Sequence, residues 1–539
     1  MKKTLYIIGL TFVVFLSSCS DNWLNQQPGG SSITQEQYQN MEGVLRGSVM
    51  GVYAMMYQYA GDHDVFGQRS IDMYGDFTCG DMALTTQNYG WFYRDELGQS
   101  YARRAFLWSY YYDIIRLTNK AINAAQKHIG KDGLLEVDTI LDNAELFFYY
   151  GEALAMRGWA YANLQKWFCY TPEQIASQGY SLTDYMSVPV YTEEVTETDT
   201  LIGAPLSSAE DVYTRAEMDI KDAIYYFDIL EKEGMARTIK QEMNADVARL
   251  NLAYLYLNKG DNDNAIKYAE EFINNTSHTL LPYSELLTTG FANIESNNWV
   301  WGQDVNVETT TALASFFGQV DVFSYSYAWA GDVKGIDELL YNSIKDKKWD
   351  ARRYWFNNLY DAKKKYQYAP DGKFYSPVVK QKNNYKKVPS AAELDRDWLC
   401  DNVYMRTELA YMIAAEAYCR KSDNANAQKY LLAITDQRTM PEKSTEYNAW
   451  KGTLSDNAVL LEEIRYNWRV EFWGEGFGLQ TFRRFGVVVN LGENHARSNK
   501  TPDPNAKSTL RQFTFEIPTG EQYYNPFLRS TTEMAVDPN

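Results

Sequence analysis

Two segments of the chain combine aromatic rings with polar side chains, a mixture suited to carbohydrate recognition. Sugar rings present C–H faces that stack on Trp and Tyr, and their hydroxyl groups need carboxylate, amide and guanidinium partners. In CGDMALTTQNYGWFYRDE the candidate contacts are Asp81, Asn88, Trp91, Tyr93 and Arg94. In SYSYAWAGD they are Tyr325, Tyr327 and Trp329. Each ring could equally pack in the core, so the residues alone leave both roles open.

Catalytic and metal-binding motifs do not emerge from the sequence. None of the histidines lies in an HExxH motif, and neither a GxSxG elbow nor a Walker loop occurs. GEGFG at 474–478 lacks the spacing of a dinucleotide loop, and DNDN at 261–264 lacks the Gly and Glu of a calcium loop. We therefore expect that the protein is not an enzyme and that it has neither a cofactor nor a metal site. A carboxylate pair for glycoside hydrolysis stays open, because carboxylate separations are invisible in a sequence.

The N-terminus predicts export and a lipid anchor. Lys2 and Lys3 precede an apolar stretch that ends at Leu16, shorter than the roughly 20 residues that span a bilayer. Ser-Ser before Cys19 is typical of a lipobox, so we predict a signal peptide over 1–18 and lipidation of Cys19. A plain secretory cleavage site is the alternative. The polar residues that follow predict a tether, which we assign to 19–45.

Composition narrows the possible partners. The net charge of -18 and the pI near 4.9 disfavour nucleic acid, because an acidic surface repels phosphates. Aromatic residues make up 15% of the chain, which favours a surface that binds ligands with flat faces. The five cysteines have no CxxC spacing, which disfavours a zinc site, and they are too sparse for a disulfide scaffold, although one bridge stays open.

Helical periodicity dominates the scaffold. Residues 105–127 repeat apolar side chains every three or four positions, and residues 142–168 do the same, with Asp142 as the expected N-cap. Residues 248–273 and 408–434 fit the tetratricopeptide pattern of small and aromatic residues in two antiparallel helices joined by a tight turn. A third unit is split between a first helix containing Gly158 and Tyr161 and a second helix over 212–230.

Two insertions interrupt this scaffold. Residues 60–100 and 283–405 are rich in Gly, Asn, Asp and aromatic residues and show no sustained helical periodicity. Long irregular segments in a compact protein are usually functional or disordered, and the aromatic content favours ordered, functional loops. We therefore predict an all-α, tetratricopeptide-like helical repeat scaffold with long irregular loop insertions. Trp299 and Trp301 are expected to pack beneath the loops, and Trp473 is expected to be structural.

The order of several motifs resembles the SusD/RagB family of Bacteroidetes outer-membrane nutrient-binding lipoproteins. The motifs are SDNWLNQQP after Cys19, RGWAYANLQKWFCYTP, VPVYTEE, SSAEDVYTRAEMDIKDAI, NADVARLNLAYLYLNKGD, RTELAYMIAAEAYCR, EIRYNWRVEFWGEGFGLQTFRRFG, EIP at 516–518 and NPFL at 525–528. Two features depart from the family: Trp468-Arg469 stands where Glu-Arg is typical, and the usual Asn-Pro-Gly-Tyr ending is missing. These differences leave the subgroup and the ligand open.

The resemblance implies a division into an N-terminal helical region, 46–235, and a C-terminal region, 236–539. It also implies a cell-surface, lipid-anchored outer-membrane protein that captures an oligosaccharide and delivers it to a SusC-like TonB-dependent barrel. The two aromatic segments occupy positions that resemble the ligand-binding loops of starch-binding relatives. A peptide or another nutrient is the alternative ligand, and a surface glycosidase is a third hypothesis.

Overall fold

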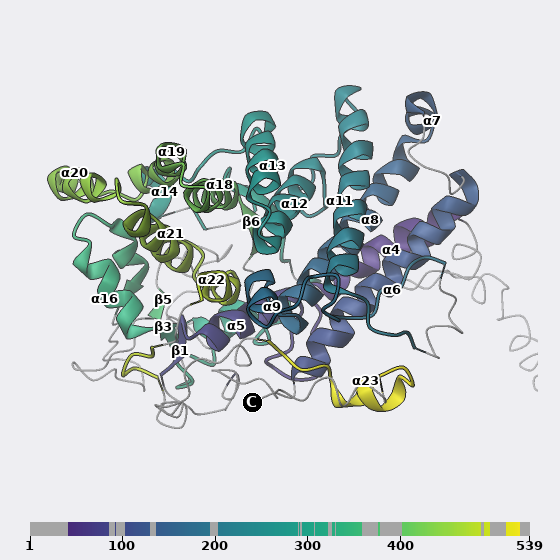
Figure 1. Ribbon diagram of the computed structural model, residues 1–539, viewed down its shortest axis with the longest axis horizontal. Coiled ribbons are helices and arrows are strands. Elements are labelled where there is room, and N and C mark those ends of the chain that lie inside the picture. Colours follow the sequence, from purple (N-terminus) through teal and green to yellow (C-terminus); the bar gives the residue numbers. More distant parts are fainter. Residues whose placement is uncertain are drawn as a thin grey trace, which may run out of the picture.

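The protein is built from a long row of helices with irregular segments packed along one side (Figure 1). The computed structural model describes residues 41–85, 92, 103–129, 136–194, 203–288, 290–291, 294–306, 308–321, 326–328, 330–357, 376–377, 401–486, 490–495 and 514–528. Within these residues the strands are short and occur in three two-stranded sheets, β1–β3, β2–β6 and β4–β5. The predicted all-α fold class is confirmed.

The helices and strands have the following bounds. The helices are α4 (Met41–Met55), α5 (Gln68–Cys79), α6 (Arg103–Ile129), α7 (Val137–Asp142), α8 (Ala144–Phe168), α9 (Pro172–Ser177), α11 (Ala209–Lys232), α12 (Ala245–Lys259), α13 (Asn262–Asn275), α14 (Tyr283–Leu286), α15 (Phe316–Val320), α16 (Glu338–Asp346), α18 (Glu408–Arg420), α19 (Asn424–Asp436), α20 (Ser444–Thr453), α21 (Asn457–Glu471), α22 (Gly478–Phe485) and α23 (Thr519–Tyr524), with the 3-10 helices η1 (Ala351–Trp355) and η2 (Pro441–Lys443). The strands are β1 (Met82–Leu84), β2 (Trp299–Gln303), β3 (Lys334–Ile336), β4 (Phe356–Asn357), β5 (Ser376–Pro377) and β6 (Asn402–Arg406).

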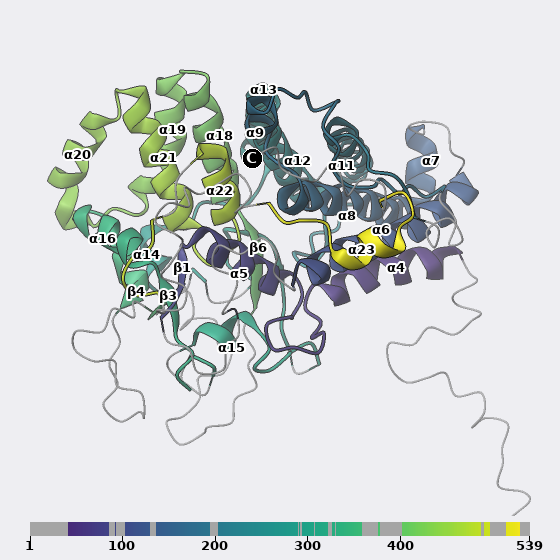
Figure 2. The ribbon, with the colours of Figure 1, turned by 60° about the horizontal axis from the view of Figure 1, so that its bottom comes forward.

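Neighbouring helices pack pairwise along the row. The contacts run from α4 through α6, α8, α11, α12, α13 and α18 to α19 and α21. Figure 2 shows β1, β3, α5 and α15 together on one side of this row. One continuous apolar core joins the row to that side, because residues from α4 to α22 belong to the same buried cluster. The row therefore forms a platform for the irregular segments.

The split unit of the sequence analysis forms the pair α8–α11. Glycine permits the two backbones to approach closely, since a Cβ on Gly158 would lie 2.6 Å from Ile220 Cγ1 and 2.7 Å from the Ala216 carbonyl oxygen. A Cβ on Gly151 would likewise lie 2.8 Å from the Phe227 ring. The predicted pairing of these two segments is confirmed. Asp142, however, is not the cap of α8: it ends α7, and Asn143 stands at the N-cap without a side-chain capping bond.

The first tetratricopeptide-like segment forms α12 and α13. Gly260 ends α12 with a φ of 81°, a left-handed conformation that glycine adopts without strain. Asp261 then caps α13 by accepting a hydrogen bond from the Asn264 amide, so the helix–turn interpretation of this segment is confirmed. Ala253 and Ala265 are fully buried. The second segment forms α18 and α19, with Asp423 as the equivalent cap.

Ala265→Phe should destabilise the protein, because Ala265 has no exposed surface in a helix packed between α12 and α18. Overpacking of this kind costs about 1–3 kcal/mol of unfolding free energy. Urea denaturation measures the change. The control is Lys267→Phe on the same helix, where the Lys267 side chain is 56% exposed and a ring can extend into solvent. Equal stability of the Ala265 variant and the wild type would contradict this repeat register.

The expectation for residues 60–100 is wrong in one respect. The segment contains α5, a helix whose twelve residues are all buried. The helix is short, and it mixes apolar side chains with Gln68, Arg69 and Asp72, which are buried and bond to one another, so the composition of this stretch does not distinguish it from a loop. The second insertion likewise contains α14, α15 and α16.

Two further observations concern membranes and cysteines. No helix in the described part of the chain is long and apolar enough to cross a membrane. Cys79, Cys169 and Cys419 are buried free thiols. Cys19 and Cys400 lie outside the described residues, so lipidation at Cys19 stays a prediction.

Candidate ligand-binding site

Strands β1 and β3 bring the two aromatic segments of the sequence analysis together. The strands are antiparallel, with Met82 opposite Ile336 and Leu84 opposite Lys334. Just beyond the last pair, the Thr85 amide donates a hydrogen bond to the Val333 carbonyl oxygen at 2.8 Å. The chain leaves β1 toward Trp91 at the same end of the sheet where it arrives at β3 from Trp329.

The turn between α4 and α5 contacts both segments. Phe66 lies 6.3 Å from the ring of Phe92, which is fully buried and also stacks on Phe77 at 5.3 Å. Three residues earlier, His63 meets Tyr327 edge-on at 5.5 Å, and the Tyr327 hydroxyl is hydrogen-bonded to His63 Nδ1. Residues 63–66 therefore contact both segments: Phe66 lies against Phe92, which follows Trp91 in the chain, and His63 lies against Tyr327.

Tyr59, His63 and Tyr327 form a row of rings with one open end. Tyr59 is 42% exposed and meets His63 edge-on at 5.5 Å, whereas Tyr327 is 8% exposed. The Tyr59 hydroxyl donates to the Gly61 carbonyl oxygen at 2.6 Å, and Gln319 donates to the His63 carbonyl oxygen at 2.7 Å. A held, exposed ring beside polar atoms can stack on the C–H face of a sugar.

Arg103 fixes this turn from the start of α6. Its guanidinium contacts Asp62 and Asp64, each at 2.6 Å. Burial raises the pKa of Asp64, and the Arg103 charge opposes that shift. Asp62 is half exposed, so its ion pair with Arg103 contributes little to stability. Asp64 is nearly buried, so its ion pair with Arg103 is less screened by solvent. These contacts hold Tyr59 and His63 in place beside the two aromatic segments.

Asp81 lies at the other end of β1, in the protein interior. It is 1% exposed, and one carboxylate oxygen accepts hydrogen bonds from Arg469 Nε at 2.8 Å and Nη2 at 2.5 Å. Its carbonyl oxygen accepts from Trp473 Nε1 and the Asp337 amide. Burial raises the pKa of Asp81, and Arg469 opposes the shift. These contacts anchor β1; a contact between Asp81 and a ligand stays a prediction.

The remaining predicted contacts cannot be placed. Six of the eight lie outside the described residues: Asn88, Trp91, Tyr93, Arg94, Tyr325 and Trp329. The expected burial of Trp299, Trp301 and Trp473 is confirmed, since each is at most 1% exposed. Tyr59 and His63 were not among the predicted contacts, because no motif marks them and only the fold brings them beside Tyr327. Among the described residues, no cluster of His, Cys, Asp and Glu could hold a metal ion.

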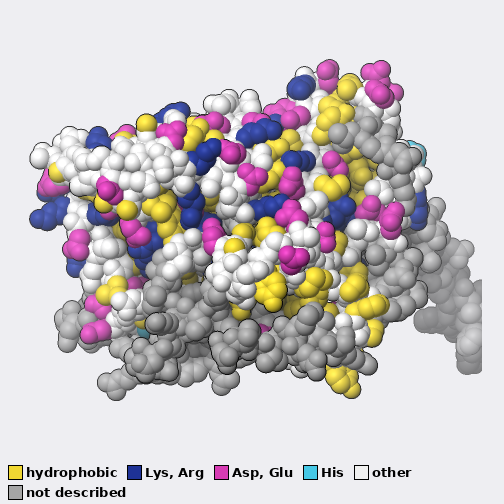
Figure 3. Space-filling model, viewed as in Figure 1, with side chains coloured by type: hydrophobic (Ala, Val, Ile, Leu, Met, Phe, Trp, Pro, Cys, Tyr) yellow, Lys and Arg dark blue, Asp and Glu magenta, His cyan; other side chains and the backbone are white. Residues whose placement is uncertain are grey.

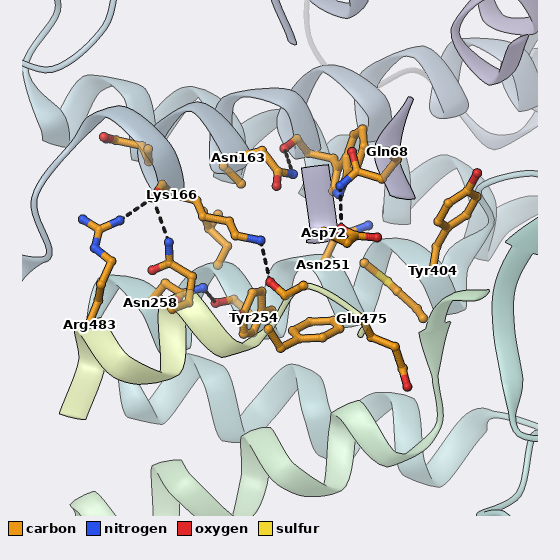
Figure 4. A pocket seen from close by; sticks show the side chains of 18 of the residues that line it. Gln68, Asp72, Asn163, Lys166, Asn251, Tyr254, Asn258, Tyr404, Glu475 and Arg483 are labelled. Carbon is orange, nitrogen blue, oxygen red and sulfur yellow. Dashed lines mark hydrogen bonds between the residues drawn. The ribbon is translucent and has the colours of Figure 1, made fainter. Parts of the chain in front are cut away.

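A separate cavity of about 80 Å³ lies where α5, α8, α12 and α22 meet (Figure 4). Its wall includes Asp72 of α5, Lys166 of α8, Asn251 of α12, Trp301 of β2 and Arg483 of α22. The sequence gives no sign of this cavity, because its wall comes from segments more than 400 positions apart, each of which has the pattern of an ordinary helix or strand. On the outer face in Figure 3, by contrast, acidic and basic side chains are interspersed.

Solved structures of similar fold cover nearly the whole chain. A SusD-like carbohydrate-binding protein from Bacteroides vulgatus is 19% identical, with a TM-score of 0.67 over 91% of this chain and 97% of that one. A SusD superfamily protein from Bacteroides thetaiotaomicron is 20% identical, with a TM-score of 0.69 over 90% and 98%. Another from Bacteroides fragilis is 18% identical, with a TM-score of 0.65 over 90% and 98%. No family model and no curated protein matches the sequence.

The protein is thus a helical-repeat platform with the β1–β3 sheet on one side. Its architecture is the SusD-like fold, as the resemblance of its motifs predicted.

Proposed function

We propose that the protein is a cell-surface glycan-binding lipoprotein that captures an oligosaccharide and delivers it to a SusC-like TonB-dependent outer-membrane transporter. The observation that carries the proposal is the convergence of the two aromatic segments. Residues 63–66 contact Phe92 of the first segment and Tyr327 of the second, which are more than two hundred positions apart in the chain, and β1 pairs with β3 between these segments. A sugar needs such a set of rings with polar groups beside them.

Binding without catalysis fits the same residues. The described part of the site offers aromatic rings and a histidine that can contact a sugar, and the Arg103–Asp62 pair that holds their turn. The SusD-like neighbour from Bacteroides vulgatus is a carbohydrate-binding protein, which supports a carbohydrate ligand here. In this proposal the acyl groups on Cys19 anchor the protein to the outer membrane, and the barrel takes over the bound glycan.

Tyr59→Ala tests the site without disturbing the core. The exposed ring should contribute on the order of 1 kcal/mol to sugar binding through apolar contact, so its loss weakens binding severalfold. Native affinity electrophoresis against starch, xylan, mannan and mucin glycans first identifies a bound glycan, and calorimetry then measures the affinity.

The matched control is Tyr180→Ala, because Tyr180 is 53% exposed and contacts Tyr185 after α9. This variant should bind the glycan as the wild type does. Failure of the wild type to bind any glycan, together with binding of peptides, would contradict the carbohydrate ligand. Release of reducing sugars from a bound glycan would contradict a purely binding role.

A further inference from the structure

The cavity between α5, α8, α12 and α22 is open at one side and closed at the other. Its rim includes Ala162, Tyr170 and Asn258, which are half-buried, and its floor includes Trp301 and Tyr404, which are buried. The floor rings support one another, since Trp301 lies 5.0 Å from Tyr404 and 5.5 Å from Trp159. A small molecule can therefore enter between α8 and α12 and meet a fixed aromatic floor.

Two buried donors that line the cavity have no hydrogen-bond partner among the described residues. They are Asn251 Nδ2 and the indole Nε1 of Trp301, in side chains whose residues are 7% and 1% exposed. A buried donor left without an acceptor is destabilising, so such groups ordinarily meet a ligand or an ordered water. An occupant of the cavity can supply the acceptor that each of these groups lacks.

The cations of the wall also lack carboxylate partners in the part of the chain that the structure describes. Lys166 Nζ donates to the Gly476 carbonyl oxygen at 2.9 Å, and Arg483 donates to the carbonyl oxygens of Lys166 and Cys169. Figure 4 shows Lys166 reaching from α8 toward the side where Asp72 and Asn251 lie. Burial lowers the pKa of Lys166, and the charges of Asp72 and Asp76 oppose that shift.

The acidic side chains of the wall are already engaged. Asp72 accepts hydrogen bonds from Gln68 and Arg69, both at 2.9 Å, and Glu475 accepts from Arg406 Nε at 2.9 Å. The donors left for an occupant therefore include the ammonium of Lys166, the two N–H groups and Arg483 Nε. A guest that brings negative charge and acceptor oxygens can accept hydrogen bonds from these groups.

We propose that this cavity binds a small carboxylate-bearing organic acid at a site separate from the glycan site. Its carboxylate would accept hydrogen bonds from Lys166, Asn251 or Trp301, and its carbon chain would lie against the aromatic floor. The volume of 80 Å³ exceeds several times the roughly 10–15 Å³ that one water needs, yet it is too small for an oligosaccharide. Because the wall joins the helical row to α5 and α22, the bound acid would also tie these elements together.

The test uses the mature protein with acetate and L-lactate as probes and glycerol as the neutral comparison. Wild-type protein should bind a carboxylate saturably in ligand-observed NMR and gain melting temperature with it. Lys166→Met should weaken that binding about tenfold or more, because it removes a charge-assisted hydrogen bond. Lys348→Met, which removes an exposed lysine far along the chain, should leave it unchanged.

Asn251→Leu keeps the proposal testable even where the Lys166 variant folds poorly. Leucine has a similar size and removes an unpartnered buried donor, so stability should hold or rise while carboxylate binding weakens. A merely structural role of Asn251 would instead lower stability. The proposal is overturned where glycerol binds as well as lactate, where Lys166→Met leaves binding intact, or where no carboxylate binds the wild type.

Discussion

Glu471→Gln should lower the free energy of unfolding by about 3–5 kcal/mol, the cost of breaking a buried ion pair from one side. Glu471 is fully buried and faces Arg438 at 2.7 Å, Arg352 at 3.1 Å and Arg406 at 3.2 Å. Its replacement by a neutral amide leaves three buried guanidinium groups with less counter-charge. Urea denaturation followed by circular dichroism measures the loss.

The control lies on the same helix. Glu462 pairs with Arg465 at 2.5 Å, but its side chain is 61% exposed, so Glu462→Gln should change stability by less than about 1 kcal/mol. Burial alone raises the pKa of Glu471, but Arg438 and Arg406 outweigh burial and hold it well below its usual range. The stabilisation by Glu471 is therefore complete at neutral pH and is lost as the pH falls below about 4.3. Equal losses in the two variants would contradict the role of this network.

The helical row was predictable because its signals are local. In α12 and α13 the small residues Ala253 and Ala265, the glycine at the turn and the Asp261 cap all lie within about twenty positions. Each of these residues acts on its immediate neighbours in the chain, so the helix pair can be recognised from the sequence without knowledge of the fold. The late motif over 463–486 was recognised by resemblance, and the structure shows what its charged residues do. Glu471 and Glu475 of this motif bind the arginines of other elements.

The arrangement of the site was not predictable in the same way. The β1–β3 contact joins two three-residue strands about 250 positions apart, and strands of that length have no sequence signature of their own. Tyr327 and Asp81 were both predicted to contact the ligand because of their side-chain types. Only the fold separates them: Tyr327 stands beside His63, and Asp81 is bound by Arg469 in the interior. Helix α5 was missed because it is short and because its polar residues, such as Asp72 and Asp76, are buried, which a sequence does not reveal.

Replacing both Trp91 and Trp329 by alanine should nearly abolish glycan binding while the fold stays intact. Each ring is expected to contribute on the order of 1 kcal/mol or more through apolar contact, so each single change weakens binding severalfold. Their sequence neighbours support this placement, since Phe92 packs on Phe66 and Tyr327 meets His63. Calorimetry with the glycan identified for the wild type measures binding.

Trp301→Ala is the matched control for this pair of changes. Trp301 is 1% exposed and belongs to the core, so its truncation should cost about 3–5 kcal/mol of stability. Trp91→Ala and Trp329→Ala should instead melt close to the wild type, because the helical row and not the aromatic segments supplies the fold. Lost stability with retained binding would make the two tryptophans core residues. Unchanged binding with unchanged stability would contradict a glycan site at the end of the β1–β3 sheet, and the ligand-binding surface would then lie elsewhere on the protein.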